Sequence, residues 1–192
     1  MKKALMIAIV LMVAVISTAC INNIAVQELN NKAAEYMKKG DYESAINRLQ
    51  ASLDLDATMY ETYYNLGIAA INANKYDIAL DAINNGIKLK PDFANFYYAL
   101  GLAQSGKADS IIDGTEVVQN NQKKTDSEDS YDKPQVELSL ADKQRAIEYK
   151  RNAAETLSKY IQLKPDAEDK QSVEDLIKEC TAFVDEEESK NQ

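Results

Sequence analysis

Few residue types in this sequence could carry out catalysis. The chain has no histidine among its 192 residues, which excludes Ser-His-Asp and Cys-His catalysis, imidazole metal ligands and histidine-based pH switching. Carboxylate pairs could perform acid–base chemistry, but no spacing among the 31 acidic residues singles out a pair, and the sequence has no glycine-rich phosphate loop. The residues therefore indicate that the protein is not an enzyme, and they predict no cofactor and no small-molecule substrate.

One acidic segment has part of the spacing of a calcium-binding loop. Oxygen-bearing side chains stand at positions 1, 3, 5, 7 and 12 of such a loop, and they are Asp126, Glu128, Ser130, Asp132 and Glu137. The glycine that the loop needs is replaced by Tyr131, and Pro134 occupies position 9. We expect a solvated loop here and predict no metal site.

The two cysteines, Cys20 and Cys180, do not indicate a disulfide framework. Cys180 has apolar neighbours at helical spacing and no C-x-x-C partner. This environment predicts a buried structural thiol rather than a redox thiol.

Cys20 follows a segment that is typical of export. Two lysines come first, an apolar run covers residues 4–16, and three small residues stand at 17–19. This order indicates a secretion signal, and the apolar run is shorter than the ~20 residues that a membrane span needs. Because it ends on a cysteine, the segment resembles a bacterial lipoprotein signal peptide.

The lipoprotein resemblance implies a signal peptide at residues 1–19 and acylation of Cys20. The protein would then be exported and anchored to a membrane of the cell envelope. Ile21, rather than aspartate, follows the cysteine, which in that family permits transport to the periplasmic side of the outer membrane if the host is Gram-negative. An ordinary signal peptide with an incidental cysteine is the alternative.

The body of the chain repeats with a period of 34 residues. The pattern of residues 40–46 returns at 74–80, and Tyr-Tyr-Asn-Leu-Gly at 63–67 returns as Tyr-Tyr-Ala-Leu-Gly at 97–101. This period and these residues resemble the tetratricopeptide repeat (TPR), a helix–turn–helix unit. The resemblance implies an all-α fold, a short solenoid of about three repeats with a C-terminal capping helix.

The third repeat is interrupted by an insertion. Residues 161–166 copy residues 87–92 at a spacing of 74, which exceeds the period by 40 residues. We therefore divide the mature chain into four segments. Residues 20–107 hold two repeats and the first helix of the third, and residues 108–138 are a polar, acidic insert that we expect to be disordered. Residues 139–184 hold the second helix of the third repeat, capped at Ser139, and a capping helix over 167–184; residues 185–192 are a charged tail, also expected to be disordered.

The resemblance also implies where a partner would bind. In this family, positions 2, 5, 9 and 12 of each first helix face a groove; here they are Gln27, Asn30, Ala34 and Met37, then Glu61, Tyr64, Ile68 and Ile71, then Asn95, Tyr98, Leu102 and Ser105. The predicted groove residues are Asn30, Tyr64, Asn65, Ile68, Tyr98 and Leu102. The family's carboxylate clamp needs several lysines or arginines, and only Asn65 fits it, so a clamp is not expected.

Tyrosine is a frequent binding anchor because it joins a large contact area to a polar tip. We expect Tyr63 and Tyr97 to serve the core and their neighbours Tyr64 and Tyr98 to face a partner; the alternative is that the neighbours merely cover helix surface. The formal charge of −9 argues against nucleic acid as a partner.

These features together predict a membrane-anchored adaptor that binds a peptide segment or helix of another envelope protein. Assembly of envelope complexes is a role that the resemblance implies. The alternative is a self-associating scaffold whose groove is filled by its own insert.

Overall fold

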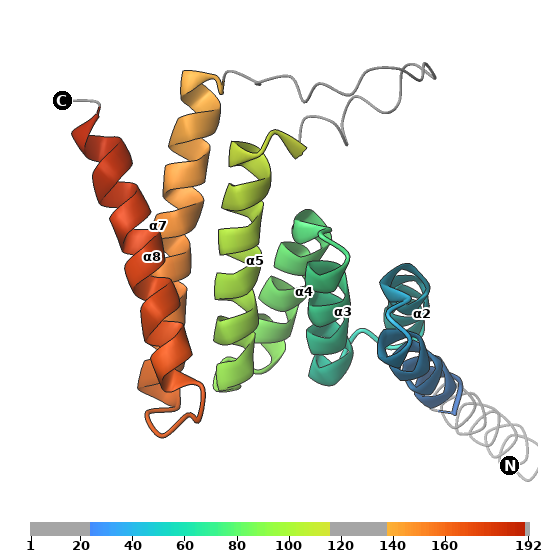
Figure 1. Cartoon of the computed structure of the whole chain (residues 1–192). Helices are drawn as coiled ribbons and strands as arrows, with labels where there is room; N and C mark the ends of the chain where they lie inside the picture. The colour runs from blue at the N-terminus through green and yellow to red at the C-terminus, as the bar shows by residue number, and fades with distance from the viewer. Residues whose placement is uncertain (1–23, 116–137, 191–192) are drawn as a thin grey trace, which may run out of the picture.

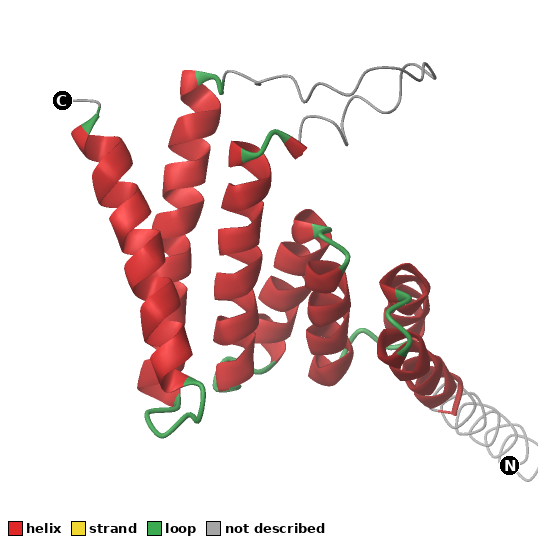
Figure 2. Ribbon diagram, in the orientation of Figure 1, coloured by secondary structure: helices red, strands yellow, loops and turns green. Residues whose placement is uncertain are grey.

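The computed structural model describes residues 24–115 and 138–190, and within these ranges the chain forms helices joined by short loops (Figures 1 and 2). The helices are residues 24–38, α2 (Tyr42–Leu55), α3 (Tyr60–Asn72), α4 (Tyr76–Leu89), α5 (Ala94–Ile112), α7 (Leu140–Leu163) and α8 (Lys170–Ser189). The prediction of an all-α fold is confirmed. Each helix packs against the next along the row in Figure 1, and α3 also touches α5.

The turns that end the first helices of repeats one and two use the same backbone device. Gly40 has φ +75°, and Asn74, one period later, has φ +55°. A residue in this left-handed conformation commonly ends a helix, and glycine and asparagine adopt it most readily. Asp41 then caps α2 by accepting a hydrogen bond from the Ser44 amide at 3.1 Å. The period in the sequence is thus also a period of backbone turns.

Two helix pairs are closed by the same close contact. A Cβ added to Gly67 on α3 would lie 2.5 Å from Ile83 Cγ1 on α4, and one added to Gly101 on α5 would lie 2.5 Å from Leu157 Cγ on α7. Gly67 and Gly101 are one 34-residue period apart, whereas Ile83 and Leu157 are 74 residues apart. The helix α7 therefore holds the same place against α5 that α4 holds against α3.

Three helix bounds differ from the expected ones. The helix α5 continues to Ile112 instead of ending at Lys107, because Ala108 and Ile111 are buried against Ala146 on α7. Residues 108–112 therefore belong to the helix rather than to the insert, whose residues 116–137 lie outside the described part of the chain.

At the C-terminus, α8 runs over Lys170–Ser189 rather than residues 167–184. The charged tail is helical as far as Ser189, because Val184 is buried and Lys190 pairs with Glu186 and Glu187, both at 2.7 Å. By contrast, the predicted cap of α7 is confirmed, since Ser139 Oγ accepts a hydrogen bond from the Asp142 amide at 3.1 Å.

Pro91 lies in the turn between α4 and α5 rather than in the first turn of α5, which begins at Ala94. It therefore ends one helix without starting the next. Among the described helices, none is long and apolar enough to cross a lipid bilayer.

A single aromatic side chain of α5 joins that helix to α3 and α4. Phe96 on α5 has no solvent exposure, and its ring lies directly against Gly86 on α4, where an added Cβ would stand 2.2 Å from the ring atom Cζ. Tyr60 and Tyr64 on α3 and Phe93 surround the other edges of the ring at centroid distances of 5.3 to 6.4 Å. The ring is therefore enclosed by α4, by two tyrosines of α3 and by Phe93.

We expect Gly86→Ala to lower the free energy of unfolding, because the new methyl group overlaps the ring of Phe96. Overpacking of this kind costs about 1–3 kcal/mol, which exceeds the gain of about 1 kcal/mol in helix propensity. In a Phe96→Ala background the overlap is absent, so the same Gly86→Ala change should be neutral or stabilising. Urea unfolding of the two single variants and the double variant, followed by circular dichroism, measures this coupling; additive effects would contradict it.

Candidate functional site

The first part of the candidate site is Tyr64, a predicted groove residue on α3. Its ring meets Phe93 and Phe96 edge to face, with centroid distances of 5.4 and 5.7 Å and interplanar angles of 86° and 81°. Such T-shaped contacts are the favoured geometry of aromatic pairs. The buried Phe96 therefore supports Tyr64 from below and fixes the orientation of its half-buried ring.

The second part is Tyr98 on α5, one period after Tyr64. Its ring lies 5.3 Å from the ring of Tyr160 on α7, at an interplanar angle of 42°. Tyr160 is 2% exposed, and its hydroxyl donates a hydrogen bond to Asp169 Oδ1 at 2.7 Å. This hydrogen bond ties the end of α7 to the start of α8 and holds the ring beside Tyr98.

These tyrosines open onto a cavity of about 530 Å³, which we call the tyrosine cavity. It lies between α3, the start of α5 and the loop from α7 to α8, which is the loop at the foot of the molecule in Figure 1. Its lining residues are Tyr64, Asn95, Tyr98, Tyr160, Lys164, Asp166, Glu168 and Asp169. Three carboxylates and one ammonium group thus surround three aromatic rings.

All three phenols stay protonated at neutral pH. Burial raises the pKa of Tyr64 and of Tyr98, with a smaller contribution from Tyr98 and from Asp169 respectively. Burial, followed by the hydrogen bond to Asp169, raises the pKa of Tyr160 to about 12. The cavity therefore offers apolar ring surface and neutral hydroxyl groups, which suit binding rather than nucleophilic or acid–base chemistry.

The predicted groove residues have different fates. Tyr64 and Tyr98 line the tyrosine cavity. The Asn30 side chain instead donates a hydrogen bond to Thr62 Oγ1 at 3.1 Å and joins the helix at 24–38 to α3. Ile68 packs, half-buried, on the main core. Asn65 and Leu102 are half-buried but do not line the cavity.

Sequence analysis did not predict the lining residues that follow the insertion in the sequence. These residues are Tyr160, Lys164, Asp166, Glu168 and Asp169. One signal could have found Tyr160: it stands 74 residues after Gly86, so a large ring replaces a glycine at the equivalent place. The acidic residues lie in a loop of residues 164–169, longer than the equivalent loop of residues 90–93, and no repeat pattern predicts their positions.

The predicted character of Cys180 is confirmed. The thiol is free and fully buried, and its Sγ lies 3.8 Å from the hydroxyl oxygen of Ser105. Burial raises the pKa of Cys180, although the contact with Ser105 and the nearby Lys150 oppose that rise. A thiol of this kind is a poor nucleophile and a poor redox centre.

Ser105 corrects the expected groove register. It is only 6% exposed, because α7 and α8 cover it. Its hydroxyl lies 3.0 Å from the ammonium of Lys150, which is 3% exposed and also pairs with Asp109 at 2.7 Å. The groove therefore ends before Ser105, and a buried polar contact replaces it.

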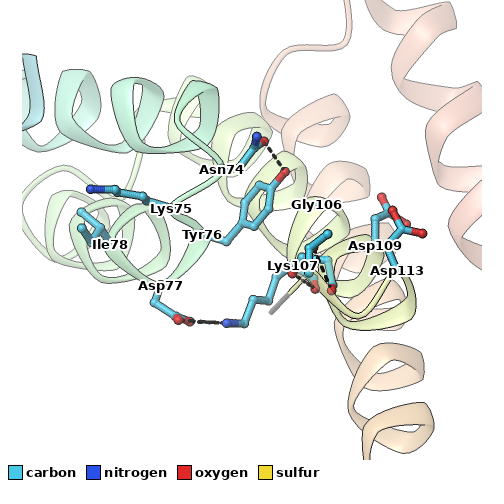
Figure 3. Close-up of a pocket in the computed structure, with 11 residues that line it drawn as sticks. Asn74, Lys75, Tyr76, Asp77, Ile78, Gly106, Lys107, Asp109 and Asp113 are labelled. Carbon is cyan, nitrogen blue, oxygen red and sulfur yellow. Dashed lines mark hydrogen bonds and ion pairs between the residues drawn. The ribbon is translucent and has the colours of Figure 1, made fainter. Parts of the chain in front are cut away.

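A second cavity of about 610 Å³ lies between the start of α4 and the end of α5 (Figure 3). Lys107 on α5 is 4% exposed and pairs with Asp77 on α4 at 2.8 Å, and Tyr76 donates a hydrogen bond to Asn74. The ion pair joins α4 to α5, and the hydrogen bond lies within the turn that leads into α4. Among the described residues, no group of three or more histidine, cysteine, aspartate or glutamate side chains could hold a metal ion; the calcium-like segment from Asp126 to Glu137 lies outside them.

The burial of Tyr160 and its hydrogen bond to Asp169 predict that stability depends on pH. Because the pKa of Tyr160 is about 12 in the folded chain and about 10 in an unfolded one, its stabilisation is complete below pH ~10 and is lost as the pH rises towards ~12. Wild type should therefore be more stable than Tyr160→Phe by about 1–2 kcal/mol near pH 8, and this advantage should shrink by pH ~11. Urea unfolding of both proteins between these pH values measures it; a constant difference would contradict the assignment.

Comparisons with known proteins agree with the repeat pattern and the helical fold. A family model described as "TPR repeat" matches residues 33–70. The TPR repeat-containing protein MJ1428 of Methanocaldococcus jannaschii is 31% identical over 81 residues, which are 42% of this chain and 14% of that protein. The chain thus spans about one seventh of the length of this curated relative.

Solved structures extend the likeness over most of the chain. The Arabidopsis OM64 TPR domain superposes with a TM-score of 0.56 at 13% identity, covering 82% of this chain and 98% of that one. The first TPR domain of human RPAP3 gives 0.57 at 15% identity, covering 85% and 95%. The first TPR of Spaghetti (RPAP3), bound to the HSP90 peptide SRMEEVD, gives 0.52 at 16% identity, covering 82% and 93%. The predicted architecture, a short all-α TPR solenoid, is confirmed.

Proposed function

We propose that this chain, a short tetratricopeptide-repeat solenoid, is an adaptor that binds a peptide segment or helix of another protein in the tyrosine cavity. The observation that carries the proposal is the meeting of Tyr64, Tyr98 and Tyr160 at one cavity. The three come from different helices, so the cavity exists only because the solenoid brings them together. Proteins of this fold work as scaffolds for protein interactions, and one of similar structure holds a peptide.

Pre-organisation supports binding at this place. The edge-to-face contacts of Tyr64 and the hydrogen bond of Tyr160 fix both rings before any partner arrives. A fixed ring loses little conformational entropy on binding, so more of its contact energy appears as affinity. The rings also remain uncharged at neutral pH, which keeps them suited to apolar contact.

The partner is expected to differ from the one seen in the peptide-bound relative. The peptide SRMEEVD ends in three acidic side chains within its last four residues. The tyrosine cavity presents Asp166, Glu168 and Asp169 against the one ammonium of Lys164. Like charges repel at these distances, so we do not expect that acidic peptide to bind here.

The proposed adaptor function predicts which variants no longer bind the partner. Tyr64→Ala with Tyr98→Ala should abolish recovery of the proteins crosslinked to the chain in its native envelope, because ring contact is lost. The matched variant, Tyr64→Phe with Tyr98→Phe, keeps the rings and should retain those proteins. Mass spectrometry of the crosslinked species, with circular dichroism to check helicity, makes the measurement. Recovery of the same crosslinked proteins from the alanine variant would contradict the proposal.

We further propose that the adaptor works at an envelope membrane, held by a lipid on Cys20. The support is the basic, apolar and small-residue order of residues 1–19 directly before that cysteine. The described helices begin at residue 24, so an anchor at Cys20 would stand next to the folded body. Assembly of envelope complexes is the role that such a position favours.

Lipid anchoring makes a separate prediction. Cys20→Ser removes the thiol that would be acylated, so the protein should move from the membrane fraction to the soluble fraction after signal cleavage. Each buried methylene is worth about 0.8 kcal/mol, so loss of the acyl chains removes the anchor. Fractionation followed by immunoblotting measures the shift, with Cys180→Ser as the control that should stay on the membrane. Full membrane retention of Cys20→Ser would contradict lipidation.

A further inference from the structure

We propose that the tyrosine cavity is a subsite for a basic side chain, a lysine or an arginine of the bound partner. The proposal rests on the peptide-binding function given above and names the chemistry that the cavity selects. It follows from three properties of the cavity: its excess of carboxylates, its neutral aromatic rings and its place in the solenoid.

The first property is charge. Asp166 and Glu168 are exposed at the rim, and Asp169 faces the cavity while accepting the Tyr160 hydrogen bond. Lys164 is the one cationic side chain among the lining residues, so two negative charges are left over. A cationic side chain that enters the cavity would be attracted by these charges, and salt would screen this attraction because the rim is exposed.

The second property is the aromatic lining. A cation is attracted to the face of a neutral aromatic ring within about 6 Å of its centroid, and more strongly where water is excluded. The chain already uses this contact at the cavity itself, since the ammonium of Lys164 lies 6.0 Å from the Tyr160 centroid. The same pairing recurs outside it, with Lys90 at 5.9 Å from Tyr60 and Lys159 at 5.6 Å from Tyr97. Ammonium groups therefore favour the tyrosine faces of this solenoid.

The third property is the position of the cavity relative to other occupants. The insert leaves the described chain at Thr115 and returns at Leu138, at the end of α5 opposite to Asn95 (Figure 1). That separation is about 26 Å along a helix rising 1.5 Å per residue, which an extended segment of 22 residues can span. What disfavours the insert as the occupant is its charge, because residues 116–137 contain six acidic and three basic residues. A second copy of the chain carries the same formal charge of −9 and is repelled. A basic segment of a different protein is the occupant that the charges favour.

The test uses three labelled peptides of one length that differ only at the central residue. The peptide is fluorescein-Gly-Ala-Leu-X-Leu-Ala-Gly, and X is lysine, norleucine or glutamate. Norleucine keeps the apolar stem of lysine without its charge, so it separates charge from contact area. Binding to the full chain is followed by fluorescence anisotropy at two salt concentrations.

We expect the lysine peptide to bind at least tenfold more tightly than the norleucine peptide and the glutamate peptide to bind most weakly. Asp166→Asn with Glu168→Gln should remove the preference for lysine and leave the norleucine affinity unchanged. The matched control, Asp81→Asn with Asp185→Asn, makes the same change in net charge at exposed residues outside the cavity and should keep the preference. A high salt concentration should weaken the lysine peptide alone.

Several results would overturn the inference. Equal affinities for lysine and norleucine would refute it while leaving the adaptor function standing, because that function is tested independently by the crosslinks of the tyrosine variants. Absence of binding by every peptide would also refute a subsite for a lone basic side chain. Deletion of residues 116–137 should leave the affinities unchanged; a large gain would instead assign the cavity to the chain's own insert, which contains Lys123 and Lys124.

Discussion

The contact between Phe96 and Gly86 is the constraint on which the site depends. Only a glycine leaves room for the ring, since a Cβ would lie 2.2 Å from it. The ring of Phe96, held in place by α4, contacts Tyr64 of α3 edge to face. The buried core thereby fixes the orientation of a tyrosine that lines the cavity. A change at Gly86 is therefore expected to affect binding as well as stability, although Gly86 is buried and does not line the tyrosine cavity.

Periodicity in the sequence predicts the parts of the fold that repeat. The 34-residue spacing gives the helix pairs, the left-handed turns at Gly40 and Asn74, and the small residues Gly67 and Gly101 at the helix crossings. It also selects Tyr64 and Tyr98, which the fold brings to one cavity. These positions are predictable because the same packing problem is solved more than once along the chain.

The repeat pattern does not predict the role of a residue when that role is set by a single tertiary contact. Ser105 stands in the groove register but is buried, because α7 and α8 close over it and place Lys150 against its hydroxyl. The hydrogen bond by which Asn30 joins two helices is likewise absent from the repeat pattern. The bounds of α5 and α8 shift for the same reason, since burial of Ile111 and Val184 prolongs both helices. Local patterns carry no information about which helix will cover a given face.

The replacement of a glycine by Tyr160 in the third repeat explains why the cavity forms where it does. In the second repeat, Tyr64 rests on Phe96, whose ring lies over Gly86; in the third, Tyr98 rests on Tyr160, which stands at the position equivalent to Gly86. The tyrosine at this repeat position is thus supported in two ways: Tyr64 by a ring from α5, the first helix of the next repeat, and Tyr98 by a ring from α7, its own paired helix. The contact of Tyr98 with Tyr160 needs no ring from α8. The loop before α8 can therefore be longer and acidic, and it lines the tyrosine cavity.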